Sequence, residues 1–310
     1  MNSELEEALL RLHAGRLVAL PTETVYGLGA DASSPEAINK IFAAKNRPTD
    51  HPLIVHIGSA QDIESWAIEV PAEAHLLAAE FWPGPLTLIL KKAPHVPSCV
   101  TGGQDSIGLR VPAHPLALEL LQRFGGGVAA PSANRFGRIS PTTAAHVQVE
   151  MAEVDCLVLD GGPCLVGVES TIVDLSHGKA RVLRPGGVSL ADLERVIGYV
   201  PEHVAKPEIR ASGCLDKHYA PTTPARLLPR DAISQAADSH SAVLARSPKP
   251  DDFPGLWLQA PESSEAYAQQ LYAALRTLDE AGYKQILIES VPDSMEWLAV
   301  RDRLRRSTAP

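Results

Sequence analysis

Apolar residues recur along the chain in two spacings, and their alternation predicts both helices and strands. Helical spacing, with its caps and breakers, covers residues 3–14, 35–45, 72–81, 115–124, 142–149 and 190–197. Short apolar runs predict strands at residues 16–20, 53–57, 86–90, 107–111, 127–130, 156–159, 169–174 and 180–183. Several strands are joined by loops too short for a crossover helix, so we expect an α/β fold with an open, twisted, mixed sheet.

The pattern stops near residue 198 and restarts near residue 225. The intervening segment has no clear apolar period and contains prolines, as interdomain linkers often do. Beyond it, strands at 225–228, 242–245 and 285–289 and helices at 265–281 and 295–306 predict a smaller α/β unit. A chain of 310 residues is longer than one core usually serves. We therefore expect a first domain over 1–198, a linker over 199–224 and a second domain over 225–310.

Composition and charge narrow the class of protein. Hydrophobic residues make up 45% of the chain, which is ample for two buried cores. The formal net charge of −9 argues against a non-specific nucleic-acid binder, so any RNA contact must be local. The four cysteines lack Cys-x-x-Cys spacing, which argues against a zinc site and against a secreted disulfide scaffold.

The N-terminal residues and the apolar segments bear on where the protein acts. Residues 1–7 are acidic and lack the apolar core of a signal peptide. No apolar stretch reaches the roughly 18 residues that a membrane-spanning helix needs. We therefore expect a cytoplasmic protein with no membrane contact.

Two cations stand at the predicted end of the second helix. Pro48 keeps Arg47 out of the helical conformation, so Lys45 and Arg47 lie at a helix-to-strand corner where they can converge on one anion. Lysine would supply a point charge and arginine a planar fork, which together suit a polyphosphate. Cations are also common at solvated helix ends because they complement the helix dipole. These residues alone favour that simpler interpretation.

Other candidate residues follow predicted strands. Residues 21–30 and 131–141 are rich in hydroxyls and glycines, and we expect the first of these segments to be a turn. Open α/β sheets bind ligands at the carboxyl ends of strands, so both segments are candidate ligand loops. Local backbone bonding by Thr22 and Thr24, or an ordinary solvated loop, would explain them equally well. Arg110 lies in an apolar strand, so we expect it either to be ion-paired or to face a ligand.

Taken together, these segments resemble the YrdC-type threonylcarbamoyl-AMP synthase family. The matching stretches are 21–27, the Lys45-x-Arg47 pair with His56, 107–112, 131–134 with 140–142, 169–172 and 184–186. Each motif is weak alone, but their order is specific and the match covers nearly the whole chain. The linker sequence Lys217-His218-Tyr219-Ala220-Pro221 and the second domain resemble the longer, two-domain branch.

The resemblance implies a nucleotidyltransferase with a YrdC-like sheet. It would act as an L-threonylcarbamoyladenylate synthase, which makes threonylcarbamoyl-AMP and pyrophosphate from L-threonine, bicarbonate or carbon dioxide, and ATP. The product would feed threonylcarbamoyladenosine modification of tRNA. The implied cofactor is Mg²⁺ accompanying ATP, with no ligands assigned. The implied macromolecular partners are tRNA and the downstream threonylcarbamoyl-transfer enzymes.

The resemblance also assigns site residues one by one. L-threonine would be held by Thr24, His56, Arg110, the backbone at Ala130, and Ser170. ATP would be held by Lys45, Arg47, His51, Ser106, Ser132, Ser140, Arg184 and Tyr219. Tyr219 belongs to the linker, so the linker is expected to fold over the nucleotide and exclude water from intermediates prone to hydrolysis. No covalent nucleophile is implied.

This sequence departs from the family pattern at a few positions. His51 stands where asparagine is usual, and Ser106 where threonine is common. Cys214-Leu215 replaces a methionine-lysine pair, which removes a cation near the nucleotide.

Two other functions stay open from the sequence. An RNA-binding module would use the family's basic concave face, but the acidic net charge and the lack of an aromatic platform argue against it. A carbamoyl-transfer subunit of a maturation enzyme would need a partner catalytic domain, and none is evident in the chain.

Overall fold

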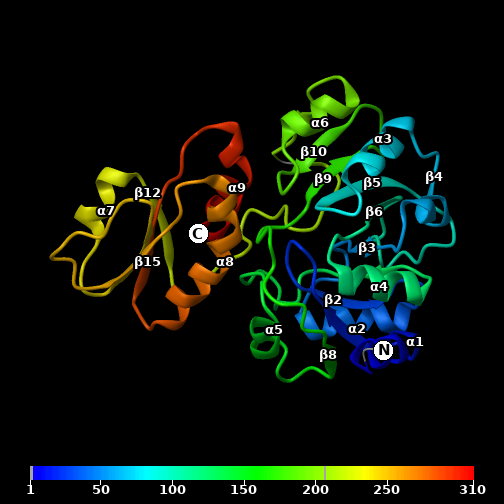
Figure 1. Ribbon diagram of the computed structural model, residues 1–310, viewed down its shortest axis with the longest axis horizontal. Helices are drawn as coiled ribbons and strands as arrows, with labels where there is room; N and C mark the ends of the chain where they lie inside the picture. The colour runs from blue at the N-terminus through cyan, green and yellow to red at the C-terminus, as the bar shows by residue number, and fades with distance from the viewer. Residues whose placement is uncertain (1–2, 206) are drawn as a thin grey trace.

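The computed structural model describes residues 3–205 and 207–310, which form two α/β units joined by a linker. Figure 1 shows the larger, N-terminal unit on the right and the smaller, C-terminal unit on the left. Each unit has its own sheet and its own apolar clusters. This arrangement confirms the predicted fold class, an α/β sheet followed by a second, smaller α/β domain.

The larger unit is built on one long, mixed sheet. Its helices are α1 (Ser3–His13), α2 (Pro35–Lys45), α3 (Ala72–Phe81), α4 (Pro115–Phe124), α5 (Ala144–Glu150) and α6 (Leu190–Ile197), with a 3₁₀ helix η1 (Ala60–Ser65). Its strands are β1 (Leu17–Leu20), β2 (Gly27–Asp31), β3 (Ile54–His56), β4 (Ala67–Ile68), β5 (Leu86–Lys92), β6 (Ser106–Arg110), β7 (Val128–Ala129), β8 (Cys156–Val158), β9 (Thr171–Asp174), β10 (Arg181–Arg184) and β11 (Glu202–His203).

The strand order of this sheet mixes parallel and antiparallel neighbours, as predicted. In the described part of the chain the order is β11-β10-β9-β5-β6-β3-β7-β2-β1-β8, with β4 paired to β5. The parallel pairs include β3 with β6 and β5 with β9, and β5 runs antiparallel to β6. The β3, β5 and β6 strands therefore lie side by side at the centre of the unit.

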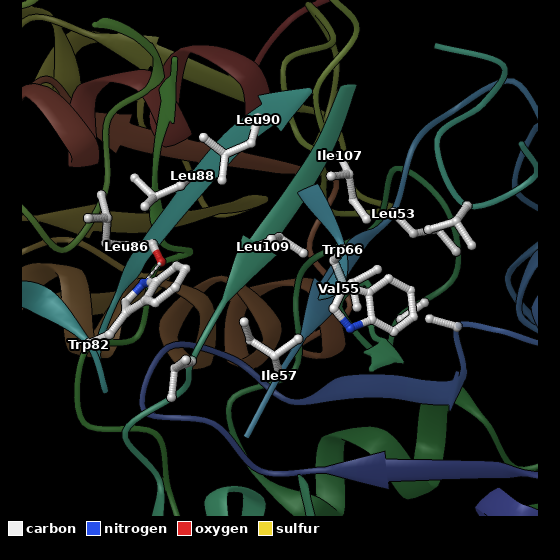
Figure 2. Close-up of a cluster of buried hydrophobic side chains, with 14 of the residues drawn as sticks. Leu53, Val55, Ile57, Trp66, Trp82, Leu86, Leu88, Leu90, Ile107 and Leu109 are labelled. Atoms are coloured by element: carbon white, nitrogen blue, oxygen red, sulfur yellow. Dashed lines mark hydrogen bonds between the residues drawn. The ribbon is translucent and has the colours of Figure 1, made fainter. Parts of the chain in front are cut away.

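Alternate residues of these three strands form the main core (Figure 2). The labelled core side chains are Leu53, Val55, Ile57, Trp66, Trp82, Leu86, Leu88, Leu90, Ile107 and Leu109. Trp82 also donates its indole N–H to the carbonyl of Leu86 at 2.7 Å, which satisfies its polar atom within the core. Successive strand residues point to opposite faces, so His56 and Arg110 point away from this core. The two are register partners on β3 and β6.

The smaller unit is a parallel sheet covered by helices. Its strands are β12 (Ala225–Leu228), β13 (Ser241–Ala245), β14 (Leu256–Gln259) and β15 (Gln285–Glu289), in the order β12-β15-β13-β14. Its helices are α7 (Arg230–Ala236), α8 (Ser264–Glu280) and α9 (Leu298–Ser307), with a 3₁₀ helix η2 (Met295–Trp297). The helices α8 and α9 lie on the side that faces the larger unit (Figure 1).

Some local expectations were wrong. Residues 27–30, expected as part of a turn, belong to strand β2, which pairs antiparallel with β1 and β7. The glycines there serve close strand packing: a Cβ on Gly29 would lie 2.7 Å from the side chain of Leu20 and 2.9 Å from that of Val128. The sequence prediction also missed the helix α7 and the strand β14, which span seven and four residues.

The linker also contains structure that its sequence did not suggest. The two residues of β11 are exposed and pair in parallel with β10, which extends the first sheet into the linker. Separately, no helix among the described residues has the length and apolar character needed to cross a bilayer.

Gly186 packs closely against the backbone that leads into β9, and this packing can be tested by substitution. A Cβ on Gly186 would overlap the backbone of Glu169, Ser170 and Thr171. We expect Gly186→Ala to lower the free energy of unfolding by about 1–3 kcal/mol, because backbone cannot yield as a flexible side chain does. Urea unfolding of the full chain measures this.

Gly108 provides the matched control in the same sheet. A Cβ there would meet its nearest atoms, in Thr87 and Ile54, at 3.4–3.9 Å, which is ordinary contact. Gly108→Ala should leave the free energy of unfolding unchanged or raise it by up to about 1 kcal/mol. Equal effects of the two substitutions would contradict the proposed close packing at Gly186.

Candidate active site

One cavity lies where the first sheet, its loops and the linker meet. Most of the predicted site residues line it: Thr24, Arg47, His56, Arg110, Ala130, Ser132, Ser170, Arg184 and Tyr219. Thr22, Glu169, Ser212, Gly213 and His218 contribute to the same lining. The structure therefore gathers residues from both ends of the first domain and from the linker around one space.

Arg110 was expected either to be ion-paired or to face a ligand, and in the structure it is ion-paired and also lines the cavity. Its Nη2 pairs with Glu23 Oε1 at 2.6 Å, its Nη1 donates to Thr24 Oγ1 at 3.0 Å, and its Nε donates to the Gly84 carbonyl at 3.2 Å. The side chain is nevertheless part of the cavity wall. A guanidinium has more N–H donors than these contacts use, so Arg110 retains donors for a ligand carboxylate.

The two threonines of the first loop behave differently. Thr22 Oγ1 donates to the Val25 carbonyl at 2.6 Å and accepts from the backbone N–H groups of Thr24 and Val25, so it stabilises the turn. Thr24 Oγ1 instead accepts from Arg110. The loop is thus a local turn that delivers the Thr24 hydroxyl to the cavity.

Several buried nitrogens in the cavity wall lack a hydrogen-bond partner among the described residues. They are Nε of Arg47, Nδ1 of His56 and Nδ1 of His218. Burial, and secondarily Arg110, lower the pKa of His56 to about 3, and burial likewise lowers the pKa of His218 to about 3. Both rings are therefore neutral near pH 7. Because buried polar atoms normally have partners, these nitrogens could bond a polar ligand in the cavity.

Buried cations in and behind this wall have neutral partners. Arg47 Nη2 donates to the Pro52 carbonyl at 3.0 Å and to Ser212 Oγ at 3.4 Å. Arg184 donates to the Ser170 carbonyl at 2.9 Å and to the Ser212 carbonyl at 2.8 Å. Burial lowers the pKa of Arg47 to about 10, which still leaves it charged at neutral pH. An anion in the cavity would complement this positive charge.

Lys45 lies behind the wall rather than in it. Its Nζ donates to the carbonyls of Ser132 and Asn134, so it holds the loop that follows β7. Burial, and then Arg47, lower the pKa of Lys45 well below its usual value. The helix ends as predicted, with Lys45 as the last residue of α2 and Asn46 in the left-handed conformation (φ 51°). Phosphate binding by Lys45 stays a prediction.

The other predicted ATP residues lie near the cavity but outside its lining. Ser106 lines a second cavity, which shares Ile54 and Ser212 with the first. Ser140 is buried and donates to Glu169 Oε1 at 2.6 Å. His51 is half-buried, with its ring 5.2 Å from that of Phe136, and burial lowers its pKa.

Glu169 is a wall residue that the sequence-based assignment missed. Its carboxylate accepts hydrogen bonds from Ser140, from Tyr272 Oη at 2.8 Å and from Arg303 Nε at 2.7 Å. Burial alone would raise its pKa, but Arg303, Arg184 and the Ser140 hydrogen bond outweigh burial and hold the pKa at about 2. Glutamate at the start of a predicted buried strand was the available signal.

The linker closes one side of the cavity. Tyr219 is buried, with its ring 4.2 Å from that of His218. Cys214 Sγ donates to the Leu183 carbonyl at 3.4 Å, which places the Cys214-Leu215 departure against β10. The remaining space measures about 50 Å³, enough for only a few water molecules.

The residues of this site do not fit a metal ion held by the protein. Among the described residues, no cluster of three or more His, Cys, Asp or Glu side chains could hold one. The Glu169 carboxylate is already engaged, and Glu23 is taken by Arg110 and by the Ala113 N–H at 3.0 Å. A divalent cation used here would have to arrive with other ligands.

Comparison with known proteins covers both units of the chain. A family model described as telomere recombination matches residues 11–186, and one described as threonylcarbamoyl-AMP synthase, C-terminal domain, matches residues 188–309. The threonylcarbamoyl-AMP synthase of Pyrococcus abyssi is 40% identical over 99% of this chain and 96% of its own length. That of Bacillus subtilis is 38% identical over 98% of this chain and 92% of its own length.

A solved structure extends the comparison to three dimensions. The crystal structure of P. abyssi Sua5 complexed with L-threonine superposes with a TM-score of 0.90 at 39% identity, covering 98% of this chain and 94% of that one. The chain therefore belongs to the threonylcarbamoyl-AMP synthase family, in its two-domain, Sua5-type form.

Proposed function

We propose that this protein is an L-threonylcarbamoyladenylate synthase, which converts L-threonine, bicarbonate or carbon dioxide, and ATP into threonylcarbamoyl-AMP and pyrophosphate. The observation that supports this most directly is the single cavity in which Arg110 and Thr24 lie close to Arg47 and Arg184. Arg110 suits an amino-acid carboxylate, and Arg47 and Arg184 suit phosphates. A relative of similar length and fold was solved with L-threonine.

Residues on the threonine side of the cavity would bind L-threonine and orient it. Arg110 would meet the carboxylate with the donors that Glu23, Thr24 and Gly84 leave unused. The unpartnered Nδ1 of His56 would bond a polar group of the amino acid. Ser170 is already held by Thr87 at 2.7 Å, which fixes its hydroxyl at the wall. With a pKa of about 3, His56 is a weak base and acts as an orienting group.

On the nucleotide side, Arg47 and Arg184 would neutralise phosphate charge. The present space of about 50 Å³ is far below the roughly 300–1,000 Å³ of ordinary ligand pockets. Residues 210–219 of the linker would therefore move aside to admit ATP and then close over it. The second cavity, with Ser106 in its wall, would open with the same motion because it also contains Arg210 and Ser212.

The reaction requires positioning and charge neutralisation rather than a covalent nucleophile. The threonine amine adds to carbon dioxide and loses a proton, giving a carbamate. A carbamate oxygen then forms a bond to the α-phosphorus while the bond to the pyrophosphate oxygen breaks. The closed linker would exclude water from the carbamate and from the mixed anhydride.

The proposal also covers the metal ion, the fate of the product and the cellular compartment. Mg²⁺ would enter on the phosphate oxygens of ATP, since the carboxylates of this site are engaged. The product would pass to threonylcarbamoyl-transfer enzymes that modify tRNA, and we expect this to take place in the cytoplasm.

Pyrophosphate release by the purified full-length protein tests the function. With ATP and Mg²⁺, we expect release only when L-threonine and bicarbonate are both present, because the carbamate is the attacking group. D-threonine serves as the matched negative substrate. Release without either substrate would indicate a generic ATPase, and no release from the folded protein would favour a binding role, with tRNA as the first ligand to test.

Arg110→Lys separates threonine binding from ATP binding. The substitution keeps a positive charge beside Glu23 but removes the planar fork. We expect the KM for L-threonine to rise by about 10–100-fold and the KM for ATP to change less than about threefold. Arg181→Lys is the control: Arg181 lies in β10 and pairs with Asp174 of β9, so the substitution should change neither value. Equal increases in both KM values would remove Arg110 from the threonine site.

His56→Gln tests whether the histidine orients or takes a proton. We expect kcat/KM for L-threonine to fall by about tenfold through the lost contact. The ratio of wild type to variant should stay constant from about pH 6 to about pH 8.5, because His56, with its pKa of about 3, is neutral throughout. His13→Gln, exposed on α1, is the control. A ratio that falls toward one below about pH 7 would identify a titrating base instead.

A further inference from the structure

The smaller unit places a buried arginine directly behind the cavity wall. Arg303 of α9 is 0% exposed, and its Nε donates to Glu169 Oε2 at 2.7 Å. Its Nη1 donates to the Pro185 carbonyl at 2.9 Å, at the corner that follows β10. Its guanidinium carbon lies 5.2 Å from the centre of the Tyr219 ring, in cation–π geometry. One side chain thus contacts the segment that leads into β9, the corner that follows β10, and the linker.

A second residue of the smaller unit reaches the same carboxylate. Tyr272 of α8 donates its hydroxyl to Glu169 Oε2 at 2.8 Å, and its ring lies 5.6 Å from that of Tyr219. Glu169 and Tyr219 line the cavity, whereas Arg303 and Tyr272 lie outside its lining. The smaller unit therefore acts on the cavity through these two wall residues.

We propose that Arg303 is a positioning residue for the synthase reaction, which fixes the Glu169 carboxylate and the Tyr219 ring and so makes the second unit part of the active site. The inference rests on the proposed function. Glu169 in turn holds Ser140, and the next residue, Ser170, lies in the wall. A shift of the carboxylate would therefore move two neighbouring groups of the site.

The charge of Arg303 matters as well as its shape. The titratable groups that face Glu169 are Arg303 of α9, Tyr272 of α8, Arg184 of β10, and His218 and Tyr219 of the linker. With Arg303 present, the pKa of Glu169 is held at about 2 in spite of its burial. Without it, burial would raise this pKa, and Glu169 would take up a proton as the pH falls toward the acid end of an enzyme assay.

The test uses the full-length protein with Arg303→Met, which removes the charge and keeps much of the side-chain volume. We expect kcat/KM for pyrophosphate release to fall about 10²-fold near neutral pH, as misplacement of groups by about 1 Å can cause. From about pH 8.5 down to about pH 5.5 the deficit relative to wild type should grow, because Glu169 becomes protonated only in the variant. Dividing kcat/KM of the variant by that of wild type at each pH removes the effect of substrate ionisation, which is the same for both enzymes.

Arg305→Met is the matched control, on the same helix with its side chain 53% exposed. It should leave kcat/KM and its pH dependence unchanged. Arg303→Lys should remove the growing deficit at low pH but regain only part of the rate, because it restores charge without the fork. An Arg303→Met enzyme with wild-type kcat/KM, or with a deficit that does not change with pH, would overturn the inference.

Tyr272→Phe keeps the inference falsifiable if Arg303→Met does not fold. It removes one hydrogen bond to Glu169 and preserves the buried ring. We expect kcat/KM to fall about tenfold, by the same factor across the pH range, because Arg303 still holds the pKa of Glu169 low. An unchanged kcat/KM would overturn the role of this contact network. A wild-type protein that releases no pyrophosphate would instead overturn the proposed function, and the inference with it.

Discussion

Buried positive charge with neutral partners is the constraint on which this site depends. Arg47 and Arg184 are removed from water, and their hydrogen bonds go to backbone carbonyls and to hydroxyls. Burying an ion costs several kcal/mol even after relaxation, so such an arrangement must be supported by the surrounding fold. The same cost becomes an advantage when an anion enters, because a desolvated cation interacts more strongly with a phosphate than a hydrated one does.

Strand alternation provides that support. The β3, β5 and β6 strands direct Val55, Leu88 and Leu109 into a continuous apolar core, while the alternate residues His56 and Arg110 face the cavity. The core fixes the backbone of both strands, so the two polar side chains have little freedom to separate. A one-residue slip in register would exchange the faces, and the apolar core opposes any such slip.

The sequence alone predicted the features that depend on a few neighbouring residues, such as helix starts and strand positions. The spacing around Ser34 and Pro35 gave α2 its start, and the apolar runs located the central strands, because caps and alternation act over a few residues. The contact between Glu169 and Arg303 joins residues 134 positions apart, and no local pattern contains it. A signal for Arg303 did exist: it shares the buried stripe of α9 with Val300 and Leu304, where an arginine is out of place unless paired.

The second unit also explains how the linker tolerates its departure from the family sequence. The family resemblance implies a lysine where Leu215 stands, and a leucine side chain cannot attract a nucleotide. Its carbonyl, however, accepts a hydrogen bond from Arg306, and the His218 N–H donates to the carbonyl of Arg306 at 3.2 Å. Arg306 is itself held by Asp302 at 2.9 Å. Helix α9 thus contacts the linker at the backbone of residues 215 and 218, and these contacts do not involve the side chain at position 215.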